Sequence, residues 1–306
     1  MRVTLSNTLT KLAKINKNLY FLSADINPGQ SIEKFKIKFP ERYIDCGISE
    51  QSMIGLAAGL ASQGKTVFTY TIATFSLFRP FEMVRDDLCY QKMPVNIIGQ
   101  GAGTSYSILG GTHSAQEDIS IARSLPNMVV FSPCDPYELE KIINYCVNIS
   151  KKPTYIRIGK TGEKNYKFQE TEIWKFGKLR KISKGKDLCI ICHGPIIKFA
   201  IQVREYFKNT FSISIYSSHT LKPFDKKGIE KIFKKFKNIL ILEDHSEIGG
   251  LQTIVKENAF EKKYSGKIIF KSLKDKFIHN YGKQEDLLNS HDISVKKIIN
   301  LIKKIK

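Results

Sequence analysis

The chain contains 306 residues, carries a formal net charge of +20 at pH 7, and 42% of its residues are hydrophobic. At roughly 100–200 residues per domain, this length predicts two domains. No apolar stretch approaches the ~20 residues that cross a bilayer, and the N-terminal segment lacks the apolar run of a secretory signal, so we expect a cytoplasmic protein with no membrane contact.

The positive charge raises the question of nucleic acid, because a clustered basic surface is the footprint of phosphate binding. Here the lysines are spread along the chain. The densest runs, 226–237 and 296–306, alternate with isoleucine and phenylalanine at helical spacing. This pattern is typical of amphipathic helices with a solvated basic face, so we expect no nucleic-acid partner.

In the first half, short runs rich in β-branched residues alternate with longer stretches of helical period. This alternation predicts an α/β domain with a parallel sheet. The expected strands are 19–23, 66–70, 95–98, 128–131 and 154–158, and the expected helices lie near 50–63, 77–91, 117–124 and 136–148.

A polar stretch then interrupts the alternation and contains the single tryptophan, Trp174. The alternation resumes with expected strands at 188–192, 213–216, 239–242 and 267–270, and with helices starting near 195, 225, 249 and 294. We therefore expect two doubly wound, mostly parallel-sheet α/β domains, at 1–160 and 186–306, joined by a linker at 161–185.

Six cysteines occur along the chain, and of these Cys189 and Cys192 are close together. Their CIIC run lies in an expected strand, where residues an odd number of positions apart point to opposite faces. We expect reduced core thiols rather than a redox or zinc pair.

The segment RYIDCGISEQSMIGLAAGLASQG places Glu50 at the start of a helix, directly after a strand and a glycine turn. The small residues of this helix would allow a neighbouring element to approach its backbone closely. A glutamate at a helix start is common by itself, since it favours the positive end of the helix dipole.

The next segment, TIATFSLFRPFEMVRDDL, sets Phe75, Phe78 and Phe81 at i, i+3 and i+6. This spacing predicts three rings along one helical face. Such a stripe is usually part of the core, although a flat heteroaromatic ligand would use the same face.

Several blocks in this region resemble the pyrimidine-binding domain of the transketolase family, to which 1-deoxyxylulose-5-phosphate synthase and the β subunits of 2-oxoacid dehydrogenases are related. They are GISEQ, AAGLA, ATFSLFRPFE, GGTHSAQEDI and RSLPNMVVFSPCDP, in that order and at the family's spacing. LKPFD and ILEDHSEIGGLQ resemble blocks of the family's C-terminal domain. The resemblance covers nearly the whole chain and implies a thiamine-diphosphate-binding fold.

The resemblance implies roles for the residues of the Glu50 and aromatic segments. Glu50 matches the glutamate that shares a proton with the aminopyrimidine ring of thiamine diphosphate. That shared proton favours the imino tautomer, which can remove the C2 proton of the thiazolium. Phe75 and Phe78 match residues that enclose the pyrimidine, and Phe81 matches a further aromatic residue beside it.

The resemblance also implies substrate contacts. Asp25 matches an aspartate near cofactor and substrate, and His113 matches a histidine that faces the substrate and could exchange a proton with a hydroxyl.

Arg2 matches one arginine of the family's phosphate clamp, and Lys160 stands in place of another. The remaining clamp positions read Gly101 and Gly29, and the aspartate before the GPTH motif is replaced by Leu109. These departures predict weaker phosphate binding and an unusual sugar substrate.

The family's diphosphate and magnesium site, a GDG motif with a downstream asparagine, is missing from the sequence. The glycines at 99, 101 and 103 lack the spacing that brings a helix N-terminus to a pyrophosphate. We therefore expect no metal site in this chain, and we expect a partner, the N-terminal half of a split transketolase, to bind the diphosphate and Mg²⁺. The family's geometry predicts an α2β2 heterotetramer, and a homodimer when the chain is alone.

The expected activity is transfer of a two-carbon ketol unit from a ketose to an aldose or aldehyde in carbohydrate metabolism. Two alternatives share the fold and cofactor: the β subunit of a 2-oxoacid dehydrogenase, and an acyloin-forming enzyme like 1-deoxyxylulose-5-phosphate synthase. A cofactor-free scaffold is a third alternative, which the retained Glu50 disfavours.

Overall fold

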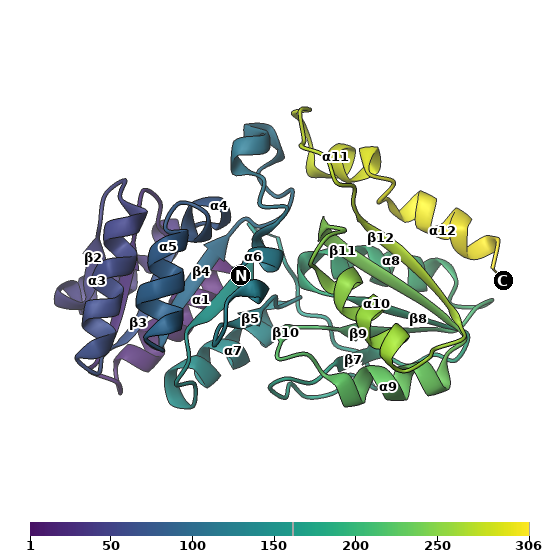
Figure 1. Cartoon of the computed structure of the whole chain (residues 1–306), viewed down its shortest axis with the longest axis horizontal. Helices are drawn as coiled ribbons and strands as arrows, with labels where there is room; N and C mark the ends of the chain where they lie inside the picture. Colours follow the sequence, from purple (N-terminus) through teal and green to yellow (C-terminus); the bar gives the residue numbers. More distant parts are fainter. Residues whose placement is uncertain (161, 306) are drawn as a thin grey trace.

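The computed structural model describes residues 1–160 and 162–305 and contains two α/β halves that lie side by side (Figure 1). Within these residues the strands form one seven-stranded and one five-stranded sheet. The predicted fold class, α/β with two mostly parallel sheets, is confirmed. Residue 161, where the expected linker begins, and residue 306, where the second expected domain ends, lie outside the described residues.

The first sheet is parallel apart from its last edge strand, β10, which comes from the second half of the chain and pairs antiparallel with β5. Across the sheet the strands are β10 (Thr220–Lys222), β5 (Val129–Phe131), β6 (Thr154–Ile158), β4 (Val95–Gln100), β3 (Thr66–Ile72), β1 (Leu19–Ser23) and β2 (Tyr43–Asp45).

Helices cover both faces of this sheet. Leucines and isoleucines of α1 and α7 pack in one core with Phe21, Phe68 and Ile156 of the sheet, and α3 and α6 contribute to a second core with Val67 and Ile97. The helices of this half are α1 (Arg2–Ala13), α2 (Glu33–Lys38), α3 (Glu50–Ser62), α4 (Ala73–Leu77), α5 (Phe81–Met83), α6 (Asp118–Ser124) and α7 (Pro136–Asn148).

The second sheet is also parallel except at one edge, where β7 runs antiparallel to β9. Its order is β12 (Lys267–Leu273), β11 (Asn238–Ser246), β8 (Leu188–Cys192), β9 (Ile213–Ser217) and β7 (Arg180–Ser183). Strand β7 lies inside the stretch expected as a linker. The helices of this half are α8 (Ile197–Tyr206), α9 (Lys226–Lys235), α10 (Leu251–Glu261), α11 (Gln284–Ser290) and α12 (Val295–Lys303).

The two basic runs form amphipathic helices, as predicted. Helix α9 buries Ile229, Ile232 and Phe233, and α12 buries Ile298 and Ile302, while the lysines between them face outward. Among the described residues, no helix combines the length and the apolar character that a membrane crossing requires.

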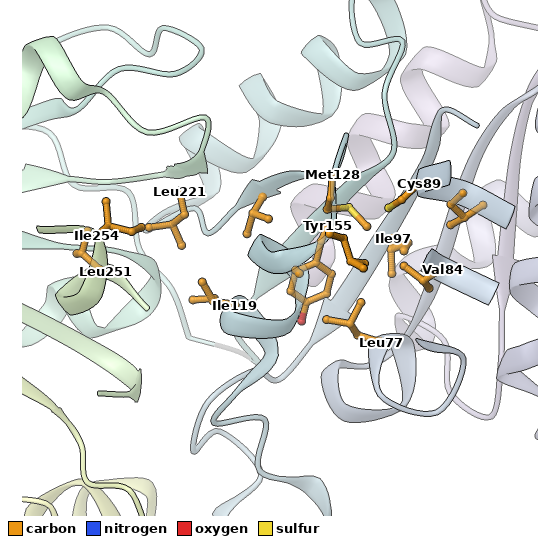
Figure 2. Close-up of a cluster of buried hydrophobic side chains, with 14 of the residues drawn as sticks. Leu77, Val84, Cys89, Ile97, Ile119, Met128, Tyr155, Leu221, Leu251 and Ile254 are labelled. Atoms are coloured by element: carbon orange, nitrogen blue, oxygen red, sulfur yellow. The ribbon is translucent and has the colours of Figure 1, made fainter. Parts of the chain in front are cut away.

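One apolar core runs across both halves of the chain. Figure 2 shows Leu77, Ile97 and Tyr155 of the first half in the same cluster as Leu251 and Ile254 of α10. Burial of such a cluster stabilises a structure by roughly 25 cal/mol per Å² of apolar surface. The relative position of the halves is therefore fixed by packing as well as by the chain connection.

Buried polar groups join the halves beside this core, and we call Thr104, Asp118, Arg157 and Asp244 the interdomain seam. Arg157 donates from Nε to Asp118 at 2.9 Å and from Nη2 to the backbone oxygen of Asp244 at 2.7 Å. The Asp244 carboxylate accepts from the backbone N–H of Thr104 at 3.1 Å and from its hydroxyl at 3.0 Å. These groups satisfy one another in a site closed to water.

Most predicted strands and helices are present, but the helix expected near 77–91 begins later, at Phe81, and is mostly π-helical. Helix α4 ends at Leu77, Pro80 precedes the short α5, and residues Val84–Tyr90 form π-helical turns. A proline lacks the N–H that a helix interior needs, which accounts for the interruption. The expected burial of Cys189 and Cys192 on opposite sides of β8 is confirmed, since they lie in different cores.

Candidate active site

Glu50 begins α3, directly after β2 and a short turn, as the sequence predicted. The residue is fully buried, at 0% exposure. The carboxylate lies at the positive end of the helix dipole, which stabilises negative charge. Among the described residues, it accepts hydrogen bonds from Nη1 of Arg79, at 2.8 Å to Oε1 and 2.7 Å to Oε2.

A pocket of about 460 Å³ opens beside this ion pair. Phe75 and Phe78 form part of its wall, and the guanidinium carbon of Arg79 lies 4.4 Å from the centroid of the Phe75 ring. The pocket is lined by Thr74, Phe75, Phe78, Arg79, Gly111, Thr112, Ser114, Glu117 and Phe277.

The break at Pro80 separates the three phenylalanines. Phe75 and Phe78 lie before it and reach the pocket, whereas Phe81 begins α5 and packs against the core shared by the two halves. The expected face with three aligned rings is therefore wrong. A contact between Phe81 and the cofactor stays a prediction.

His113 lies next to Phe75, in a 3-10 turn formed by Gly111–His113. The two rings meet edge to face, with centroids 5.2 Å apart, and His113 Nδ1 is 2.9 Å from the Thr112 hydroxyl. Gly110 has φ of +74°, and a Cβ there would lie 2.5 Å from the Tyr281 ring, so only glycine fits this turn. The turn thus holds His113 at the edge of the pocket.

Tyr106 connects His113 to the two predicted cationic substrate residues. Its ring centroid is 6.2 Å from that of His113, and Lys160 Nζ lies 4.6 Å from the same ring. Burial raises the pKa of Tyr106, while its hydrogen bond to Gln100 and the positive charge of Arg2 act in the opposite direction. His113 and Lys160 therefore lie beside the same ring, and Arg2 is near enough for its charge to act on Tyr106.

Asp25 does not join this group. Its side chain is exposed, and its backbone N–H donates to the oxygen of Gly47 at 2.9 Å, in the turn that leads to Glu50. Its φ of +62° is rare for a residue other than glycine and marks a constrained position. A role for Asp25 stays a prediction.

Sequence reasoning did not assign seven residues of the pocket to the site: Thr74, Arg79, Gly111, Thr112, Ser114, Glu117 and Phe277. Thr74 and Arg79 flank the predicted phenylalanines, so their block could have suggested them. Burial, followed by the neighbouring Asp118, raises the pKa of Glu117. Phe277 lies far along the chain, in the segment between β12 and α11, and no pattern in the sequence connects it to the pocket.

The pocket fits a flat, nitrogen-rich ring. A planar guanidinium already lies over Phe75 and donates to Glu50, so these two residues can receive a planar group that carries N–H donors. Thr74 also lines the pocket, and its buried hydroxyl has no hydrogen-bond partner among the described residues.

A second cluster of possible ligands, Cys134, Asp135 and Glu138, is buried at the junction of the halves. Glu138 accepts from the backbone N–H of Cys134 at 2.7 Å and from Arg180 at 3.0 Å. Burial, followed by the charge of Glu138, raises the pKa of Asp135 to about 6. Arg180 pairs with both carboxyl groups, so part of their ligand capacity is already used within the protein.

Family models match both halves of the chain. The model described as the transketolase pyrimidine binding domain matches residues 1–163, and the model described as the transketolase C-terminal domain matches residues 177–298.

Known proteins are similar over nearly the same length. A transketolase C-terminal section from Methanocaldococcus jannaschii is 35% identical over 305 residues, which cover 99% of this chain and 95% of that protein. One of the subunits of an apulose-4-phosphate transketolase from Phocaeicola vulgatus is 30% identical over 269 residues, with 88% and 86% covered. A solved structure, described as a split gene transketolase in an inactive β4 tetramer, matches with a TM-score of 0.88 at 28% identity and covers 99% of this chain and 97% of that chain.

Proposed function

Because the chain belongs to the transketolase family, we propose that it is the subunit of a split, thiamine-diphosphate-dependent transketolase that activates the cofactor. The buried Glu50 carboxylate, which is paired with Arg79 in the wall of a pocket that Phe75 and Phe78 also line, is the observation that carries this proposal. When bound, thiamine diphosphate supplies a nucleophilic carbon that takes up a two-carbon ketol unit from a ketose and passes it to an aldehyde.

In this proposal, Glu50 shares a proton with the aminopyrimidine ring nitrogen and so favours the imino form of the exocyclic amine. Phe75 and Phe78 enclose the pyrimidine ring, and the burial of Glu50 keeps its carboxylate out of contact with bulk water. Burial supports this role, because a carboxyl group removed from water interacts more strongly with the one group placed beside it.

His113 is proposed to exchange a proton with a substrate hydroxyl. Its contact with Phe75 puts its ring at the edge of the cofactor pocket, on the side where Tyr106, Lys160 and Arg2 lie. This arrangement supports a substrate path that runs from the pocket past His113 toward the two cations. Asp25 is proposed to reach cofactor and substrate only in the assembled enzyme, since its side chain is exposed here.

A partner chain is proposed to bind the diphosphate and Mg²⁺, since this sequence has no GDG motif. Helix α3 offers a surface for that chain: Gly55 and Gly59 are exposed, and a Cβ added to either would meet no described atom within 4 Å. Exposed Ile48 and Leu56 flank the same region next to Glu50. We propose an α2β2 heterotetramer in the cytoplasm, and a homodimer when this chain is alone.

The substrate is proposed to be an unusual sugar rather than a standard pentose phosphate. Lys160, Gly101 and Gly29 stand where the family's phosphate clamp has bidentate or hydrogen-bonding groups, and a lysine point charge does not replace the planar fork of arginine. The name of the relative that acts on apulose 4-phosphate supports a family branch with uncommon substrates. Efficient turnover of xylulose 5-phosphate and ribose 5-phosphate by the reconstituted pair, with micromolar Michaelis constants, contradicts this proposal.

The experiment that tests the function is Glu50→Gln in the complex with the partner chain. We expect turnover to be abolished while the circular dichroism spectrum and melting temperature stay unchanged. Glu140→Gln, at an exposed position of α7, is the matched control and should keep full activity. If Glu50→Gln kept more than about a tenth of wild-type activity, a loss under ~1.4 kcal/mol in barrier height, Glu50 would not be the activating acid. Formation of an acyloin from pyruvate instead of ketol transfer would favour the synthase alternative.

A further inference from the structure

Arg79 occupies the pocket of the free chain in an unusual way. One of its nitrogens, Nη1, donates to both oxygens of Glu50, at 2.8 Å and 2.7 Å, and its guanidinium carbon lies 4.4 Å from the centroid of the Phe75 ring. The two partners differ in burial: the Glu50 side chain is 1% exposed, and that of Arg79 is 40% exposed. The acid is therefore fixed within the protein, whereas the cation reaches it from solvent.

A guanidinium and an aminopyrimidine share the features that this pocket recognises. Both are planar, both carry N–H donors at their edge, and both present a π face to an aromatic ring. The face of Phe75 and the oxygens of Glu50 cannot serve both groups at once. Resting on the proposed function, we infer that Arg79 holds the place of the aminopyrimidine in the free chain and must leave before the cofactor can bind.

A Glu50 carboxylate without any partner would be costly, so the aminopyrimidine has to exchange with Arg79 at this carboxylate. A buried carboxylate without a partner is strongly destabilising, whereas an arginine that is already partly exposed loses little when it moves into water. Arg79 therefore stays on Glu50 until another donor replaces it. Glu117 lines the same pocket and offers an acid near which the displaced cation can rest.

The exchange sets the affinity of the free chain for the aminopyrimidine. When only a fraction of molecules has the pocket open, the apparent dissociation constant is the intrinsic value divided by that fraction. A chain with Arg79 on Glu50 in about nine molecules of ten thus binds about tenfold more weakly than a chain without the arginine. Arg79 is in this sense a residue that determines cofactor occupancy, separate from the groups that hold the cofactor.

Titration of the isolated chain with thiamine, followed by calorimetry, tests this inference. Arg79→Met removes the guanidinium and keeps an unbranched apolar stem, and we expect thiamine to bind at least tenfold more tightly than to wild type. Arg79→Lys keeps a charge without the planar group and should fall between the two. The control is Arg85→Met, because Arg85 lies on the neighbouring π-helical turns, is 63% exposed and pairs with Asp86.

A double-mutant cycle separates competition from an indirect effect. In a Glu50→Gln background Arg79 has lost its charged partner and keeps only a neutral acceptor and the Phe75 ring, so Arg79→Met should change thiamine affinity much less than in wild type. Melting temperatures show whether each variant is folded, and Arg79→Lys carries the test if Arg79→Met does not fold. Affinity no higher in the Arg79 variants than in wild type, undetectable binding included, overturns the inference. The proposed function fails on a different result, an active Glu50→Gln enzyme in the complex with its partner.

Discussion

The interdomain seam and the Glu50 pocket both bury charge, but they differ in how completely the buried groups are paired. In the seam, Arg157 is 2% exposed and donates to Asp118 and to the backbone oxygens of Ala115 and Asp244. In the pocket, Glu50 is just as buried but is paired with the partly exposed Arg79, and the nearby Thr74 hydroxyl has no described partner.

This difference separates groups that stabilise the fold from groups that are available to a ligand. A buried network in which each member is satisfied gives rigidity, and it has no bonding capacity left for a substrate. A buried acid with one exchangeable partner keeps its capacity to bind something else. By burial and charge alone, Asp118 and Glu50 would be equally good candidates for a ligand site. The identity of their partners distinguishes them.

The largest expected effect is a loss of folding stability when the interdomain seam is disrupted. Replacing Arg157 with methionine leaves the Asp118 carboxylate buried without its cation, which typically costs about 3–5 kcal/mol. We expect the free energy of unfolding in urea to fall by that amount. Arg85→Met, which breaks an exposed pair, should cost under about 0.5 kcal/mol. Equal losses in the two variants would mean that the seam contributes no more than a surface ion pair.

The pocket should show the opposite response, a loss of binding without a loss of stability. Phe75→Ala removes the ring on which the cofactor is proposed to lie, and we expect cofactor affinity in the assembled enzyme to fall about 10–30-fold, from lost stacking and lost apolar contact. Phe260→Ala, at a 90% exposed position on α10, is the matched control. If Phe75→Ala lowered the melting temperature and left cofactor affinity unchanged, the ring would belong to the core and not to the site.

Two histidines near the junction of the halves are expected to make the free energy of unfolding depend on pH. Per pH unit, this effect is smaller than that of the Arg157 substitution. Burial is the main cause that lowers the pKa of His219 to about 3 and that of His245 to about 4. Below an unfolded pKa of about 6.5, the unfolded chain takes up protons that the folded chain does not. The free energy of unfolding should therefore fall as the pH drops from about 6.5 to 4, by up to ~1.4 kcal/mol per pH unit for each histidine.

Urea unfolding at several pH values measures this slope. His245→Asn should give a flatter dependence than wild type, and the exposed His279→Asn should leave it unchanged. Because Nε1 of Trp174 donates to His219 at 3.1 Å, the fluorescence of that tryptophan reports the same transition locally. Parallel slopes in wild type and His245→Asn would show that this histidine is not held neutral in the fold.

The sequence predicted the parts of the fold and site that depend on local pattern. Buried valine and isoleucine runs identified strands such as β4 and β6, and the change from a strand to small residues identified α3 with Glu50 at its start. The short β10 was missed, because its three residues carry too little periodicity to be recognised. The break at Pro80 was also missed, since the spacing of the phenylalanines was taken as one uninterrupted helix.

Residues brought together by tertiary contact could not be predicted in the same way. Phe277 reaches the pocket from the second half of the chain through the packing between the halves, which no local pattern encodes. The Arg79 contact with Glu50 depends on where the chain turns after α4, and a change of one residue in that turn would aim the guanidinium elsewhere. The sequence identified Glu50 and the phenylalanines, but it did not identify Arg79 as the residue that contacts them in the structure.

Strand β10 has a consequence for any attempt to dissect the protein. It is encoded after the second sheet has begun, yet it covers the edge of the first sheet by pairing with β5. A fragment that stops between the halves would carry β5 as a bare edge, with unsatisfied N–H and C=O groups that invite other chains to add to it. The halves should therefore be produced together, and a truncated pyrimidine domain is expected to aggregate rather than to fold as a clean module.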